Sequence, residues 1–266
     1  MKKRTQFSTF TPMGHVFDFQ EAGQYAQWLE MDRHSDAAER QSQLMIKLIN
    51  PAYGDRLLDI GCGTGVTLAG MDRMKPGLDL TGLDASTYML DIAGKKLRNR
   101  AELFKGNAEA LPFEDNAFNF AVLNLTLEFV ESPEKAIAEA ARVAKDRLYI
   151  GFFNRLSLGA VPSLGKGLHG NTVYSKAHFL STWEVRQLIR GLLGKVPISS
   201  RTITYHPPAG GRLIGRLFRR LPYGAYTGMS ISLVPRFTTR PLSLFAEKTL
   251  SQNMSIGEQF FKPDPQ

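Results

Sequence analysis

The chain has 266 residues, of which 43% are hydrophobic and 22% charged, values ordinary for a globular protein with room for one α/β domain and insertions. Its single cysteine excludes an internal disulfide framework, and no apolar run reaches the roughly 20 residues that a membrane-spanning helix needs. The net charge of +8 favours anionic partners, and the composition as a whole predicts a cytoplasmic protein.

The first part of the chain predicts two helices, followed by alternating strands and helices. Apolar residues at helical spacing predict helices over 21–33 and 39–50. Strands are then expected at 56–60, 78–83, 102–105, 118–123 and 147–153, and helices at 66–74, from Ser86 and from Ser132-Pro133. This repeated strand–helix order predicts a parallel sheet covered by helices on both faces.

The pattern changes after residue 153. A capping box at 181–184 predicts a further helix, and two late strands follow at 198–205 and 229–234. We expect a single domain over 1–250 and a flexible tail over 251–266. Within the domain, insertions at about 154–180 and 207–226 are expected to cover the substrate.

A glycine-rich loop, Gly61-Cys62-Gly63-Thr64-Gly65, lies between the first predicted strand and a helix. Glycines let the backbone turn tightly and approach a ligand closely, although a tight turn without a ligand is the alternative. Asp84 ends the second strand, where its carboxylate can hold ribose hydroxyls or interact with a helix dipole. The third glycine comes one residue earlier than in the dinucleotide pattern G-x-G-x-x-G, which favours a cofactor without a pyrophosphate.

Four segments together resemble the motifs of class I S-adenosylmethionine (SAM)-dependent methyltransferases, in particular the type 11 group that includes ubiquinone and menaquinone methyltransferases. These segments are 57–65, 83–90, 106–113 and 124–133. The resemblance implies a Rossmann-like α/β fold, with a seven-stranded, mostly parallel sheet, helices on both faces and a C-terminal antiparallel hairpin. It also implies SAM as the cofactor and methyl transfer to a small-molecule, hydrophobic or lipid-like acceptor.

The resemblance further implies which residues hold the cofactor. They are Asp59, Gly61, Cys62, Gly63, Gly65, Asp84, Ala85, Met89, Asn107, Ala108, Asn124 and Leu125. Tyr25 and Trp28 would cover the substrate, and plain helix packing is their alternative role. The chain departs from the family at Asn119, which often is Asp, and at Phe129, which often is His, so that one polar group near the acceptor is lost.

Methyl transfer from a sulfonium needs mainly alignment and desolvation, and a general base only when the acceptor must lose a proton. The candidates for such a base are His169, Tyr174 and His178, in and after the glycine-rich insertion, and a surface polar role is the alternative for each. No residues have the spacing of metal ligands.

Residues 211–221 predict an amphipathic helix with one apolar and one arginine-rich side. This segment suits peripheral membrane contact or the steering of an anionic substrate, and packing over the substrate pocket with a solvated basic rim is the alternative. A nucleic-acid partner is not expected, because no RNA-binding module is appended. The alternatives for the protein's function are an RNA methyltransferase and a SAM-binding protein without turnover. The sequence carries no signal for an oligomeric state.

Overall fold

Residues 14–156, 176–203 and 225–233 are described by the computed structural model of the protein, and all of them belong to one compact unit of the chain. The elements in chain order are α1 (Phe19–Glu30), α2 (Asp32–Ile49), β1 (Arg56–Ile60), α3 (Val66–Met74), β2 (Asp79–Asp84), α4 (Thr87–Leu97), β3 (Glu102–Lys105), β4 (Phe118–Asn124), α5 (Pro133–Val143), β5 (Ala144–Phe153), α7 (Thr182–Leu193), β6 (Ile198–Ile203) and β7 (Tyr226–Ser232).

The two N-terminal helices differ most from the sequence prediction. A capping box formed by Asp18 and Glu21 starts α1 two residues before the predicted start at residue 21, because capping groups rather than apolar spacing define a helix start. Helix α2 begins at Asp32 rather than at residue 39. Residues 32–38 are mostly polar and carry no apolar stripe, so hydrophobic periodicity does not predict this first part of the helix.

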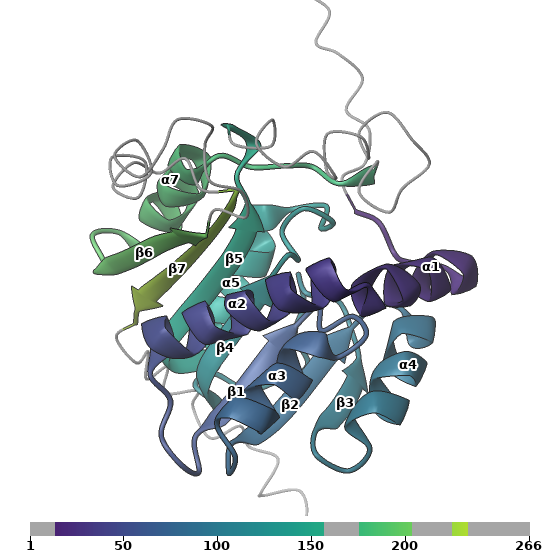
Figure 1. Cartoon of the computed structure of the whole chain (residues 1–266). Coiled ribbons are helices and arrows are strands. Elements are labelled where there is room, and N and C mark those ends of the chain that lie inside the picture. Colours follow the sequence, from purple (N-terminus) through teal and green to yellow (C-terminus); the bar gives the residue numbers. More distant parts are fainter. Residues whose placement is uncertain (1–13, 157–175, 204–224, 234–266) are drawn as a thin grey trace, which may run out of the picture. The chain divides into compact units, whose positions relative to one another are not determined.

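The seven strands form one sheet in the order β3-β2-β1-β4-β5-β7-β6, shown in Figure 1. Strands β3, β2, β1, β4 and β5 are parallel neighbours, whereas β7 is antiparallel to both β5 and β6. This confirms the predicted mostly parallel sheet with an antiparallel pair at its C-terminal end. Strand β7 starts at Tyr226 rather than at 229, since Thr227 and Gly228 interrupt the apolar run that sequence reasoning follows.

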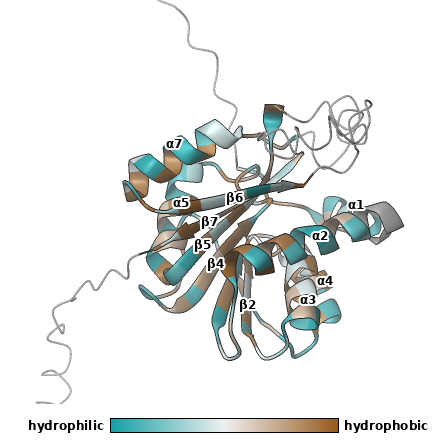
Figure 2. Cartoon of the chain, turned by 60° about the vertical axis from the view of Figure 1, so that its left-hand side comes forward, coloured by the Kyte–Doolittle hydropathy of each residue, from teal (hydrophilic) through white to brown (hydrophobic). Residues whose placement is uncertain are grey.

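Helices cover both faces of this sheet. Helices α2, α3 and α4 share one buried cluster with side chains from one face, and α5 and α7 share a second cluster with the other face. Figure 1 shows α2 crossing in front of the central strands. In Figure 2, hydrophobic residues concentrate on the central strands, while α2 and α7 carry both hydrophobic and hydrophilic residues. Within the described ranges, no helix is long and apolar enough to cross a membrane.

Candidate active site

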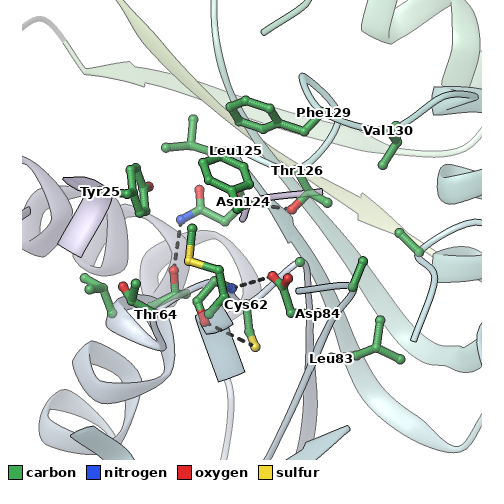
Figure 3. Close-up of a pocket in the computed structure, with 18 of the residues that line it drawn as sticks. Tyr25, Cys62, Thr64, Leu83, Asp84, Asn124, Leu125, Thr126, Phe129 and Val130 are labelled. Atoms are coloured by element: carbon green, nitrogen blue, oxygen red, sulfur yellow. Dashed lines mark hydrogen bonds between the residues drawn. The ribbon is translucent and has the colours of Figure 1, made fainter. Parts of the chain in front are cut away.

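A cavity of about 720 Å³ lies at the carboxyl ends of β1, β2 and β4. Its wall includes the glycine loop after β1, Asp84 at the end of β2 and Asn124 at the end of β4. Parallel α/β sheets bind their ligands at this edge, where the strand order reverses on either side of β1. The cavity is therefore the candidate active site, and Figure 3 shows part of its lining.

The three glycines of the loop all have a left-handed backbone, with φ of 73°, 52° and 73° at Gly61, Gly63 and Gly65. A Cβ on Gly61 would lie 2.5 Å from Thr126 Cγ2, and one on Gly65 would lie 2.9 Å from Leu97 Cδ1. A Cβ on Gly63 would meet no atom within 4 Å. Gly61 and Gly65 thus permit close packing inside the protein, whereas Gly63 leaves open space on the cavity wall for a ligand.

Asp84 joins the end of β2 to the glycine loop. Its Oδ2 accepts a hydrogen bond from the backbone N–H of Gly63 at 2.8 Å, and its Oδ1 accepts one from the N–H of Ser86 at 2.9 Å. Burial raises the pKa of this carboxyl, and the two backbone donors act in the opposite direction. Each oxygen keeps lone-pair capacity toward the cavity, which suits the acceptance of hydrogen bonds from ribose hydroxyls.

Asp59 is a buried carboxyl near the loop that lacks hydrogen bonds to the described residues. Its side chain is 1% exposed, and neither carboxyl oxygen has a hydrogen-bond partner among the described residues. Burial, together with the nearby charge of Asp84, raises its pKa to about 8. A buried carboxyl without partners favours a cationic ligand nearby, and the sulfonium and ammonium groups of SAM are cations. The residues present therefore fit the cofactor that the sequence implies.

The wall beyond Asp84 is suited to a planar apolar group. Ala85, Met89 and Ala108 lie on it, and Met89 and Ala108 are buried. Asn107 is also on the wall, and its Oδ1 accepts a hydrogen bond from the N–H of Glu109 at 2.9 Å, which holds this turn in place. An adenine ring would find apolar faces and a polar edge here.

A strap formed by residues 14–17 crosses the cavity and carries aromatic contacts. The N–H of His15 donates to the carbonyl of Phe129 at 2.7 Å, and Ser86 Oγ donates to the carbonyl of Phe17 at 2.7 Å. The Phe17 ring lies 5.1 Å from that of Phe129 and 5.9 Å from that of Tyr25. Phe129, at which the sequence departs from the family pattern, is therefore part of an aromatic wall.

Most of the residues predicted from the sequence line this cavity. Those on the wall are Tyr25, Trp28, Gly61, Cys62, Gly63, Asp84, Ala85, Met89, Asn107, Ala108, Asn124 and Leu125. Asp59 and Gly65 lie beside the cavity and not on its wall. His178 is exposed and away from the wall, and its N–H donates to the carbonyl of Glu128 at 2.8 Å. His169, Tyr174 and the basic segment 211–221 lie outside the described residues.

Several wall residues were not predicted from the sequence. They are the strap residues, Arg40 and Gln41 on α2, Thr64 and Thr67 around the start of α3, Thr126, and Phe153 at the end of β5. The strap has no periodicity and no motif, so only the capping box at Asp18 and Glu21 signals where it stops. Among the described residues, no group of three or more His, Cys, Asp or Glu side chains is arranged to hold a metal ion.

A family model described as "Methyltransferase domain", of type 11, matches residues 58–150. A demethylmenaquinone methyltransferase of Renibacterium salmoninarum is 34% identical over 122 residues, which are 45% of this chain and 50% of that one. An uncharacterised protein of Methanocaldococcus jannaschii is 32% identical over 192 residues, covering 71% of this chain and 85% of that protein. The chain belongs to the type 11 family of class I SAM-dependent methyltransferases.

The solved structures agree with this family at the level of the fold. A SAM-dependent methyltransferase from Thermotoga maritima superposes with a TM-score of 0.56 at 24% identity, over 80% of this chain and 96% of that one. The predicted Rossmann-like class I fold is confirmed, and SAM is the cofactor of the family. The aligned region spans only about half the length of the demethylmenaquinone methyltransferase it matches.

Proposed function

We propose that the protein transfers the methyl group of SAM to a small-molecule, hydrophobic acceptor. The observation that carries this proposal is the continuity of one cavity, which joins the Gly63–Asp84 cradle to an aromatic wall formed by Phe17, Tyr25 and Phe129. A polar cradle beside an aromatic wall suits a polar cofactor next to an apolar acceptor. The relatives named demethylmenaquinone methyltransferases support the same acceptor class.

SAM supplies, when bound, a methyl group that a positively charged sulfur makes electrophilic. The chain's own residues bind and align. Asp84 presents acceptors for ribose hydroxyls, Gly63 lets the backbone come close, and Asn124 ends β4 at the cavity wall. The aromatic wall gives the site an apolar lining, and alignment with desolvation provides much of the rate in such a displacement.

His15 is a candidate general base on the cavity wall for an acceptor that must lose a proton. It lies on the wall, and its Nε2 is 2.8 Å from Glu21 Oε2. A carboxylate in this position orients an imidazole and fixes which ring nitrogen carries the proton. His15→Asn should therefore lower kcat for an acceptor that must lose a proton and leave kcat unchanged for an acceptor that is already deprotonated, and equal kcat values of variant and wild type on both acceptors would remove His15 from the mechanism.

The direct test incubates the full chain with SAM labelled in its methyl group and with fractionated cell extract. We expect the label in the lipid or small-molecule fraction, and much less label there with Asp84→Asn, a variant designed to weaken cofactor binding. Label in RNA would favour the RNA methyltransferase, and that binding would depend steeply on salt. Binding of S-adenosylhomocysteine without label in any fraction would favour a non-catalytic SAM-binding protein, and no binding by the folded protein would end the proposal.

A further inference from the structure

Two buried tyrosines begin a chain of hydrogen bonds that ends on the cavity wall. Tyr149 on β5 and Tyr226 on β7 are fully buried, and their hydroxyl oxygens are 2.9 Å apart. The Tyr226 hydroxyl donates to Asn124 Oδ1 at 2.6 Å, and Asn124 Nδ2 donates to Thr67 Oγ1 at 3.1 Å. Asn124 and Thr67 both line the cavity, and Figure 3 shows Asn124 among its lining residues.

The direction of this chain follows from counting protons. Tyr226 has one hydroxyl proton, which it donates to Asn124, so Tyr149 must donate to Tyr226. The Asn124 amide is thereby held with its oxygen toward Tyr226 and its nitrogen toward Thr67. Thr67 Oγ1 accepts from that nitrogen, and its own proton has no acceptor within the described part of the chain. The chain therefore ends in a hydroxyl donor that is available to a ligand in the cavity.

The sheet has two glycines where this chain needs room. Strand β5 lies between β4 and β7, and Gly151 pairs with Asn124 on one side and with Gly228 on the other. A Cβ on Gly151 would collide with the Tyr226 hydroxyl and would lie 2.5 Å from Asn124 Oδ1. A Cβ on Gly228 would lie 2.5 Å from the Tyr149 hydroxyl. Gly151 is therefore required for the Tyr226 hydroxyl to reach across β5 to Asn124, and Gly228 makes room on β7 for the Tyr149 hydroxyl.

The corner of the cavity around Thr67 suits a carboxylate. Thr67 lies in the first turn of α3, where the helix dipole favours negative charge. Thr64 is also on the wall, is 1% exposed, and has a hydroxyl without a hydrogen-bond partner among the described residues. Arg40 on α2 lies on the same wall, where it is paired with Asp36 at 3.5 Å. Two hydroxyl donors beside a helix N-terminus match the amino-acid end of SAM, which bears a carboxylate.

We propose that Tyr226, backed by Tyr149, is a positioning residue that holds Asn124 so that the Thr67 hydroxyl donates to the carboxylate of SAM. This inference rests on the proposed function, namely that the cavity binds SAM. Tyr226 touches no ligand itself, and it acts by fixing which way the Asn124 amide points. Without the Tyr226 hydroxyl the Asn124 amide is free to flip. The Thr67 hydroxyl then donates its hydrogen bond to Asn124 Oδ1 and is no longer available to the ligand.

The test measures by calorimetry the binding of S-adenosylhomocysteine and of 5′-methylthioadenosine, which keeps the adenosine and the sulfur but lacks the amino-acid carboxylate. We expect Tyr226→Phe and Thr67→Val each to weaken S-adenosylhomocysteine about 5- to 10-fold, the effect of losing one hydrogen bond to a charged group. Methylthioadenosine affinity should stay unchanged. The double variant should be no weaker than the weaker single variant, because both changes remove the same donor.

The matched control is Thr227→Val, which removes a buried hydroxyl that has no hydrogen-bond partner among the described residues, next to Tyr226 on the same strand. It should leave both affinities unchanged. Thermal melting checks the folding of each variant. If Tyr226→Phe does not fold, Tyr149→Phe, which keeps the Tyr226–Asn124 bond, should show a smaller loss of the same selectivity. Equal losses of affinity for both ligands, or additive losses in the double variant, would overturn the positioning role. A wild type that binds neither ligand would overturn the proposed function itself.

Discussion

Asp84 and Gly63 are 21 residues apart in the chain, yet Asp84 Oδ2 accepts the Gly63 N–H at 2.8 Å. This bond ties the end of β2 to the loop after β1, and it places the ligand-facing glycine next to the carboxylate expected to hold the ribose. The second oxygen of Asp84 is equally engaged, by the N–H of Ser86. The cofactor cradle is therefore shaped before any ligand arrives, which reduces the entropic cost of binding.

Replacing Asp84 by Asn should weaken S-adenosylhomocysteine binding about 10- to 100-fold, because one oxygen becomes an NH₂ that opposes a backbone donor. Calorimetry at constant salt measures the loss. Asp79→Asn is the control, since Asp79 is an exposed carboxylate on the same strand, paired with Arg56 at 3.4 Å and remote from the cavity. Equal affinity of Asp84→Asn and wild type would contradict the assigned role.

Alanine substitutions at Gly61 and Gly63 should differ in their effects, the first acting mainly on the stability of the fold and the second mainly on ligand binding. Gly61→Ala should cost about 2–4 kcal/mol of unfolding free energy, since it combines a left-handed backbone with a collision against Thr126. Gly63→Ala should cost only about 1–2 kcal/mol, because its Cβ meets open space, yet it should weaken S-adenosylhomocysteine at least about tenfold by filling that space. Urea unfolding and calorimetry on both variants test the contrast, and the reverse ranking would contradict this view of the loop.

Glu128 should make stability depend on pH. The residue is 1% exposed, its Oε1 accepts the N–H of Phe153 at 3.0 Å, and its Oε2 has no partner among the described residues. Burial raises its pKa from 4.5 to about 7, so the folded state holds this proton more tightly than the unfolded state does. The associated stability is full below pH 4.5 and is lost as the pH rises through 7.

The wild type should lose unfolding free energy when the pH is raised from 5 to 8.5. The Glu128→Gln variant should lose less, by an amount on the order of 1–3 kcal/mol, since a pKa unit corresponds to about 1.4 kcal/mol. Urea unfolding at both pH values gives the comparison. Asp59, whose pKa of about 8 is also raised, should keep a residual pH dependence of the same sign in this variant. A difference between variant and wild type that does not grow with pH would contradict the assignment.

The strap should contribute to cofactor retention through Phe17. Phe17→Ala removes the ring that packs between Tyr25 and Phe129, so we expect roughly fivefold weaker S-adenosylhomocysteine binding from lost apolar burial. Phe19→Ala, two residues away, removes a ring that is 72% exposed and should leave the affinity unchanged. Stopped-flow dissociation of the ligand should show the Phe17 effect in the off-rate, and an identical off-rate in both variants would exclude this role for the strap.

Local signals predicted the elements that lie beside the cofactor. The turn at Gly61 to Gly65 sits where the sequence places it, because only glycine readily adopts a left-handed backbone at three nearby positions. Helix α5 starts at Pro133 after the Ser132 cap, as expected, because capping depends on neighbours in the chain. The start of α2 and the strap at 14–17 were not predicted, since neither carries an apolar repeat.

The sequence by itself determined the order of strands and helices, because periodicity and helix caps are properties of residues close together in the chain, and the resemblance of four short segments to methyltransferase motifs indicated the cofactor. Only the tertiary structure decided which side chains complete the site. It brings Lys176 to Glu21 across 155 residues and Tyr226 to Asn124 across 102, and the second contact depends on the strand order and on the glycine at 151. No local sequence pattern predicts such pairs, because the two partners lie far apart in the chain and come together only in the folded protein.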